Sequence, residues 1–155
     1  MTVSSATNEE SFAGNGVTVS FPLPFRFFFN SEVIAELITD ATGAIVPMVF
    51  GVDYSLTGAG APESAGSATG VLTTVAPVPS GVTLFVRREI PLTQPTDIIN
   101  QGRFFSELHE KVFDRLTMQM QQSASSLGKS LRVSPNEPSP SYLPPIADRD
   151  GKLLS

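Results

Sequence analysis

The chain has 155 residues, a net charge of −5 and no cysteine, and only 16% of its residues are charged, against about 25% in an average globular protein. That length suits one compact domain with an appendage. The composition excludes disulfides, thiolate metal sites and a strongly charged disordered chain, while the frequent glycine and proline favour a turn-rich β-protein.

The charge is divided unevenly along the chain. Residues 1–86 carry a net −6 and residues 87–155 a net +1, so phosphate backbones would be repelled and we expect no nucleic-acid partner. No apolar run approaches the roughly 20 residues of a membrane span, and the polar N-terminus lacks the features of a signal peptide. We therefore expect no membrane partner and a protein made, and soluble, in a cytosol.

Short strands punctuated by turns are predicted for the first part of the chain, after an N-terminal arm at 1–10. Residues 11–13 are expected to pair back on the first strand as a hairpin through Gly14-Asn15-Gly16. Pro47 indicates an edge position for its strand. The strands, spaced by about ten residues, predict an antiparallel β-sandwich or small barrel over residues 11–89. They are residues 17–21, 32–39, 44–50, 54–57, 70–75 and 82–88.

The pattern then changes to an extended crossover at 90–104 and one long helix at 105–128, with Ser106 as N-cap. A mostly apolar stripe follows the 3.6-residue period of the helix. Since no second helix is expected to cover this stripe, it either lies on the sheet or packs against copies of itself, and we favour self-association. An extended, proline-rich tail is predicted at 129–155. The stripe consists of Phe105, Leu108, Val112, Leu116, Met120, Ser123 and Leu127.

No constellation of reactive side chains is found, and we expect no catalytic residue, cofactor or metal, so the protein is predicted not to be an enzyme. His109, the single histidine, has Ser106 one turn away but lacks an orienting carboxylate and an oxyanion hole. One helix face holds three acids with two bases between them, which indicates a solvated charged face rather than a metal site. These are Glu107, Glu110 and Asp114, with Lys111 and Arg115.

Five phenylalanines fall within the nine residues FPLPFRFFF, from Phe21 to Phe29. Most of them are expected in the core. Because neighbours along a strand alternate sides, some of Phe27, Phe28 and Phe29 are expected to face another subunit or a partner protein.

These segments together resemble a known family. In order, FPLPFRFFF, GVDYSLTGAG, a GVLTT strand, RREIPLTQPTDIINQGRFF and ELHEKVFDRLTMQMQQ are similar to the N-terminal region of tail-fibre and tailspike proteins of short-tailed bacteriophages. The resemblance covers about residues 11–130 and is most specific between 91 and 122. The segment LPPIADRDGKLLS also looks like the stretch that such proteins carry between helix and shaft.

The resemblance implies a structural virion protein, synthesised in the host bacterial cytoplasm, whose β-domain attaches a fibre or tailspike to the phage tail. The helix stripe is then expected to form a homotrimer. Tail tube, adaptor or nozzle proteins are the implied partners. We interpret Phe27–Phe29, Arg87 and Arg88 as the candidate tail-docking residues, with rings in the core and arginines solvated at a strand end as the alternative. Either the chain is a piece of a longer fibre, or a second fibre or tailspike protein attaches at its C-terminus.

A lectin-like β-sandwich that binds host-surface glycan remains the alternative function. Such sites present aromatic platforms on loops, whereas the loops at 58–69 and 76–81 contain no aromatic residue. Binding to a glycan array would distinguish this module from an anchor.

Overall fold

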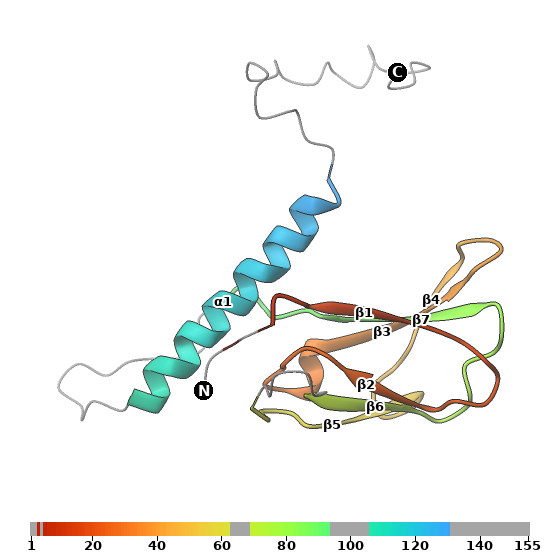
Figure 1. Cartoon of the computed structure of the whole chain (residues 1–155), viewed down its shortest axis with the longest axis horizontal. Helices are drawn as coiled ribbons and strands as arrows, with labels where there is room; N and C mark the ends of the chain where they lie inside the picture. Colours follow the sequence, from red (N-terminus) through yellow and green to blue (C-terminus); the bar gives the residue numbers. More distant parts are fainter. Residues whose placement is uncertain (1–2, 4, 63–68, 94–105, 131–155) are drawn as a thin grey trace, which may run out of the picture.

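Two antiparallel sheets and one long helix make up the part of the chain that the computed structural model describes, which is residue 3 and residues 5–62, 69–93 and 106–130 (Figure 1). One sheet has four strands in the order β1-β7-β3-β4, and the other has three in the order β2-β6-β5. The strands are β1 (Glu9–Ala13), β2 (Ser20–Leu23), β3 (Val33–Thr39), β4 (Ile45–Pro47), β5 (Tyr54–Thr57), β6 (Gly70–Thr74) and β7 (Val82–Arg88). A single turn of 3-10 helix, η1 (Asn30–Glu32), precedes β3, and α1 spans Ser106–Gly128.

The two sheets lie face to face and enclose one apolar core, as the alternation of apolar residues predicts. Both sheets and the segment between β2 and η1 contribute side chains that are completely buried, among them Leu23, Phe25, Phe27, Leu72 and Leu84. The predicted antiparallel sandwich followed by one long helix is confirmed.

Most strands lie where the sequence placed them, and Pro47 ends the edge strand β4, whose one partner is β3. An edge position suits proline, which has no N–H to donate to a further strand. Outside the described residues lie 94–104 of the predicted crossover (90–104), 63–68 of the predicted loop (58–69), Phe105, and 131–155 of the predicted tail (129–155). The domain boundaries therefore stay predictions. In the described part of the chain, no helix has the length and apolar character to cross a membrane.

The expected hairpin between residues 11–13 and 17–21 is wrong. In the structure β1 pairs with β7, with Phe12 opposite Leu84, while β2 pairs with β6 in the other sheet, with Phe21 opposite Leu72. The chain changes sheets after Gly14. Pairing with distant strands prevails over the local turn, because each strand then aligns an apolar residue with one of the core, and the Phe12 and Phe21 rings, with centroids 5.2 Å apart, pack from one sheet onto the other.

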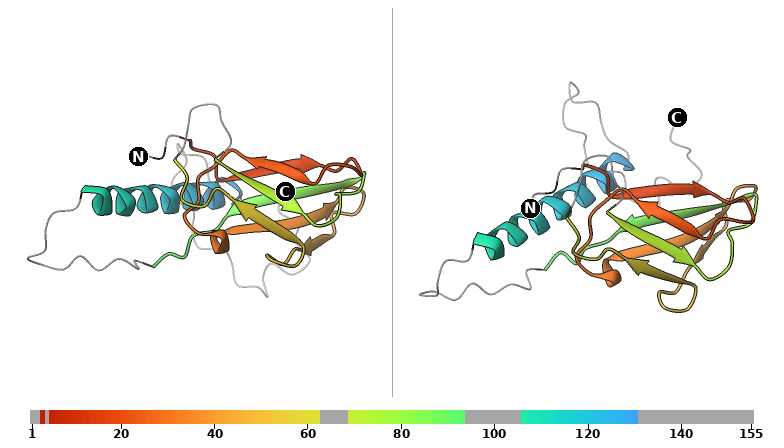
Figure 2. Two further views of the ribbon diagram at one scale, coloured as in Figure 1. Left: turned by 90° about the horizontal axis from the view of Figure 1, so that it is seen from below. Right: turned by 60° about the horizontal axis from the view of Figure 1, so that its bottom comes forward.

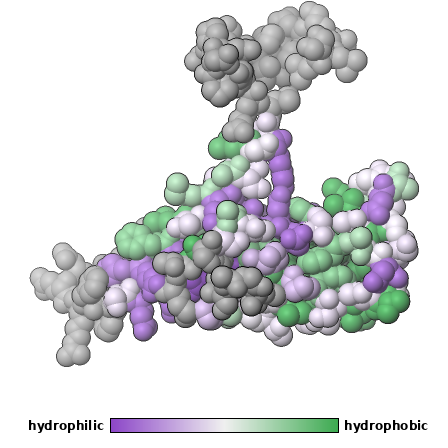
Figure 3. All heavy atoms as spheres, viewed as in Figure 1, coloured by the Kyte–Doolittle hydropathy of each residue, from purple (hydrophilic) through white to green (hydrophobic). Residues whose placement is uncertain are grey.

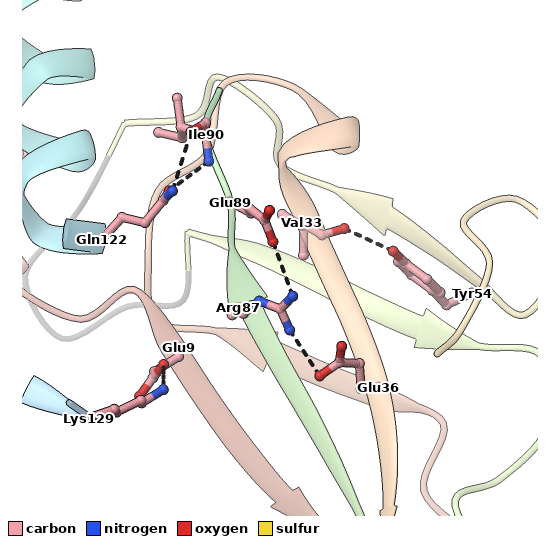
Figure 4. A network of polar contacts seen from close by, with 9 residues as sticks. All are labelled: Glu9, Val33, Glu36, Tyr54, Arg87, Glu89, Ile90, Gln122 and Lys129. Atoms are coloured by element: carbon pink, nitrogen blue, oxygen red, sulfur yellow. Dashed lines mark hydrogen bonds and ion pairs between the residues drawn. The ribbon is translucent and has the colours of Figure 1, made fainter. Parts of the chain in front are cut away.

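Tyr54 ties the two sheets together. Its phenol, on β5, donates a hydrogen bond of 2.9 Å to the carbonyl of Val33 on β3 (Figure 4). Burial raises the pKa of Tyr54, and a backbone hydrogen bond from Ala35 only partly offsets this. The phenol therefore stays protonated and able to donate its hydrogen bond at neutral pH.

The change of sheet at Gly14 leads to a prediction about stability. A Cβ at this position would lie 2.6 Å from the carbonyl oxygen of Val82 and closer still to that of Pro79. We expect Gly14→Ala to lower the free energy of unfolding by about 1–3 kcal/mol, measured by urea unfolding followed by circular dichroism. Gly128→Ala is the control, because a Cβ there meets open space and should leave stability unchanged or slightly higher. Equal stability of the Gly14 variant and the wild type would contradict the close packing of the Val82 and Pro79 carbonyls around Gly14.

Candidate functional site

Helix α1 lies against one end of the sandwich, where β1 begins and β7 ends (Figures 1 and 2). Contacts with this end recur at helical spacing along one face of α1. Only two helix residues on that face are fully buried, Asp114 and Met118. The helix is therefore docked mainly through polar side chains, and this polar contact is called the docking interface below.

Two ion pairs form the centre of the docking interface. Arg26 Nη1 lies 2.6 Å from Asp114 Oδ2, and the two side chains are only 4% and 6% exposed. Arg115 Nη1 lies 2.9 Å from Glu32 Oε1, and Glu32 is 3% exposed. The second oxygen of Glu32 accepts hydrogen bonds from the backbone N–H groups of Phe28 and Phe29. Breaking such a buried pair from one side costs about 3–5 kcal/mol.

Arg88, at the end of β7, extends the docking interface. Its Nη1 donates to the carbonyl of Arg26 at 2.6 Å and its Nη2 to the side-chain oxygen of Gln121 at 2.7 Å. Both arginines also lie over phenylalanine rings of the FPLPFRFFF segment, Arg26 at 4.8 Å from the Phe28 centroid and Arg88 at 6.0 Å from that of Phe25. Part of the phenylalanine cluster therefore holds cations in place rather than only filling the core.

Three glutamines of α1 bind backbone groups of segments that flank the sandwich. Gln122 accepts from the N–H of Ile90 at 2.7 Å and donates to its carbonyl (Figure 4). Gln119 donates to the carbonyl of Pro91 at 2.7 Å, and Gln121 donates to that of Ser5 at 2.8 Å. The N-terminal segment and the residues after β7 are thus both attached to the helix.

Charged pairs also lie at the border of the docking interface. Just after the helix end, Lys129 Nζ is 2.6 Å from Glu9 Oε2 on β1. On the sheet surface, Arg87 pairs with Glu36 and Glu89 at 2.9 and 3.1 Å. Partial burial by itself would lower the pKa of Arg87, but the hydrogen bonds and charges of the two glutamates outweigh it and raise the pKa. Arg87 therefore stays charged and held by its own sheet.

The opposite face of α1 carries the predicted apolar stripe. Successive residues of a helix are about 100° apart, so Leu116 projects roughly 200° away from Asp114. Leu116, Met120 and Leu127 are 51%, 73% and 57% exposed, and Phe113 beside them is exposed as well. Leu108 and Val112 are half-buried, Ser123 is exposed, and Phe105 lies outside the described residues. No described part of the chain covers the exposed members of this stripe.

The residues expected to dock onto the tail have different environments. Phe27 is completely buried in the core and Arg88 is 1% exposed, so neither has surface to offer a partner. Phe28 is half-buried beside Arg26, and Arg87 is paired on its own sheet. Phe29, at 61%, is the one ring of the three with most of its surface exposed. Packing within the sandwich and against α1 accounts for the difference.

A second exposed apolar surface lies at the end of the sandwich away from α1 and is called the distal end below (Figure 3). A hollow of about 390 Å³ opens there between the β3–β4 hairpin and the segment after β6. Its charged lining residue, Asp53, accepts a hydrogen bond from the N–H of Val49. The exposed large apolar residues at this end are Ile45, Val46, Val49, Phe50, Val52 and Val75.

Asp114 does not serve the acidic cluster considered in the sequence, because it is paired with Arg26. Among the described residues no group of three or more metal-binding side chains is found. The docking interface was not predicted from the sequence. The one signal was a second stripe, Asp114, Gln121 and Ser125 at helical spacing, but a polar stripe normally marks a solvated face.

The comparisons agree with the family resemblance. No family model matches the chain. Over 132 residues, or 85% of its length, the chain is 41% identical to the tail spike protein of Salmonella phage epsilon15, and it spans 12% of that protein. The chain is therefore homologous to the N-terminal region of that tail spike protein.

The central ion pair should be important for stability. We expect Asp114→Ala to lower the free energy of unfolding by about 3–5 kcal/mol, because the buried Arg26 guanidinium loses its carboxylate partner. Urea unfolding followed by circular dichroism measures the change. Glu107→Ala removes an exposed acid from the same helix and should change stability by less than about 0.5 kcal/mol. Similar stability losses in the two variants would contradict a buried pair.

Proposed function

We propose that the chain is a structural virion protein that attaches a trimeric tailspike or fibre to the phage tail. The observation that carries the proposal is the exposed apolar stripe of α1, on the side of the helix opposite its docking interface. Homology to the N-terminal region of a tail spike supports this role. The proposed location is the virion, and no reactive side chain is needed for an attachment function.

Three copies associate in this proposal through Val112, Leu116 and Met120, together with the other stripe residues. Bundled helices bury such stripes against each other, at roughly 25 cal/mol for each Å² of apolar surface removed from water. The stripe becomes polar at Ser123, so the bundle is short and weak by itself. Docking of each helix on its own sandwich compensates, because the helix is ordered before copies meet.

The distal end is the proposed contact with the tail. It lies at the other end of the sandwich from α1, so it stays accessible when the helices associate. The large apolar side chains exposed there are aliphatic and aromatic, which suits the apolar core of a protein–protein contact. The proposed occupant is a tail protein of the virion with an uncharged, apolar surface. Phe29, at the other end, is a second exposed candidate.

Association through the stripe can be tested in solution. Replacing Val112 and Leu116 together by Asp should abolish the trimer. At each of the two positions, three carboxylates, one from each copy, would be brought together in an apolar bundle. Analytical ultracentrifugation at micromolar concentration measures the change, and circular dichroism should retain the β-signal. Thr117→Asp adds a charge to an exposed position beside the stripe and should still give trimers. A wild-type chain that sediments as a monomer would rule out autonomous trimerisation.

Contact through the distal end can be tested in phage particles. Val52→Asp combined with Val75→Asp should leave the trimer intact but strongly reduce the amount of the protein in purified virions, because charges would be buried in the apolar contact. Quantitative mass spectrometry of the particles gives the measurement. Ser55→Asp, on the exposed side of β5, is the control with normal incorporation. Normal incorporation of the double variant would exclude the distal end as the contact.

A further inference from the structure

We infer that the docking interface determines which face of α1 is offered to neighbouring copies, with Asp114 and Arg115 as the positioning residues. The inference rests on the proposed association through the stripe. It explains why the apolar stripe faces away from the sandwich. An amphipathic helix beside a sandwich normally buries its apolar face against its own domain.

The hydrophobic effect would favour burial of the stripe within one chain, so an unfavourable free-energy contribution must oppose that burial. The end of the sandwich that receives α1 holds Arg26, Glu32 and Arg88, and none is more than 3% exposed. A helix rolled by half a turn would place Leu116 and Met120 on these groups in place of Asp114, Arg115 and Gln121. Buried charges without such partners cost several kcal/mol each, so this end of the sandwich selects the polar face of the helix.

The polar contacts extend along the helix and so fix its rotation. They begin at Asp114, continue at Gln121 and Gln122, and end at Lys129, which is about 22 Å further along at 1.5 Å per residue. A contact at a single point would allow the helix to rotate about its own axis. Contacts spread along one face over this length prevent that rotation. Met118 is the one large apolar side chain of α1 that is fully buried in the docking interface, so the exposed stripe residues Leu116, Met120 and Leu127 are left for other copies.

The native pair Lys129–Glu9 supplies a direct measurement of docking. The amine and the carboxylate lie 2.6 Å apart and are both accessible, so a carbodiimide should join them as a zero-length cross-link within one chain, detected by mass spectrometry. Sedimentation of the same samples reports association. The two measurements separate the position of the helix from the state of the trimer.

The test variant is Asp114→Ala combined with Arg115→Ala. We expect its cross-link yield to fall at least about fivefold and the dissociation constant of its trimer to rise at least about tenfold, while the β-signal in circular dichroism remains. Glu107→Ala with Lys111→Ala removes one exposed acid and one exposed base from the same helix and should change neither value. This control matches the test variant in charge.

A second variant guards against simple unfolding. Arg26→Met with Asp114→Leu replaces the central ion pair by apolar groups, which is often neutral or stabilising for a fold. We expect it to remain folded but to lose part of its cross-link and association, because one of the three buried charged groups at this end of the sandwich no longer disfavours the apolar face, while Glu32 and Arg88 remain. Wild-type values for this variant would overturn the inference.

Failure of the positioning role and failure of the proposed trimer give different results in these experiments. If the Asp114/Arg115 variant keeps its cross-link, or loses it and still forms trimers as tightly as the wild type, the positioning role is overturned and the proposed function stands. If the wild-type chain is cross-linked but monomeric, the proposed trimer fails and this inference fails with it.

Discussion

The arrangement of this chain depends on the buried ion pair between Arg26 and Asp114, which joins the sandwich to its helix. A carboxylate and a guanidinium removed from water stabilise the structure only while they remain together. The pair therefore sets one rotation of the helix much more strictly than an apolar contact of similar area would. Through that rotation it sets the position of every exposed group on α1.

The phenylalanine segment has two roles that follow from this constraint. Phe25 and Phe27 are buried in the core between the sheets, as expected for a sandwich. Phe25 lies beside the guanidinium of Arg88, and Phe28 lies beside that of Arg26. Burial away from water disfavours these charges, and contact with the ring faces partly offsets that cost. Most of these rings are expected in the core from the sequence, and the structure adds that the segment also supports the interface with α1. The exposed apolar surface lies elsewhere, on the far side of α1 and at the distal end.

The proposed attachment role needs one surface for copies of the chain and another for the particle, and the two exposed apolar surfaces lie on different elements. Homology to the N-terminal region of a tail spike is consistent with this separation. The β-sandwich supplies a rigid connection between the two surfaces, since Tyr54 and the Phe12–Phe21 contact join its sheets.

The sequence alone determined most of the strands, the edge position of Pro47 and the limits of the helix, because turn residues and hydrophobic periodicity are local signals. It also determined which helix residues form the apolar stripe. Only the tertiary structure decided that β1 and β2 belong to different sheets, that Arg88 is internal and that the stripe faces away from the sandwich. Each of these depends on pairing between residues far apart in the chain, such as Arg26 with Asp114, and a polar residue has the same pattern whether its partner is water or a buried charge.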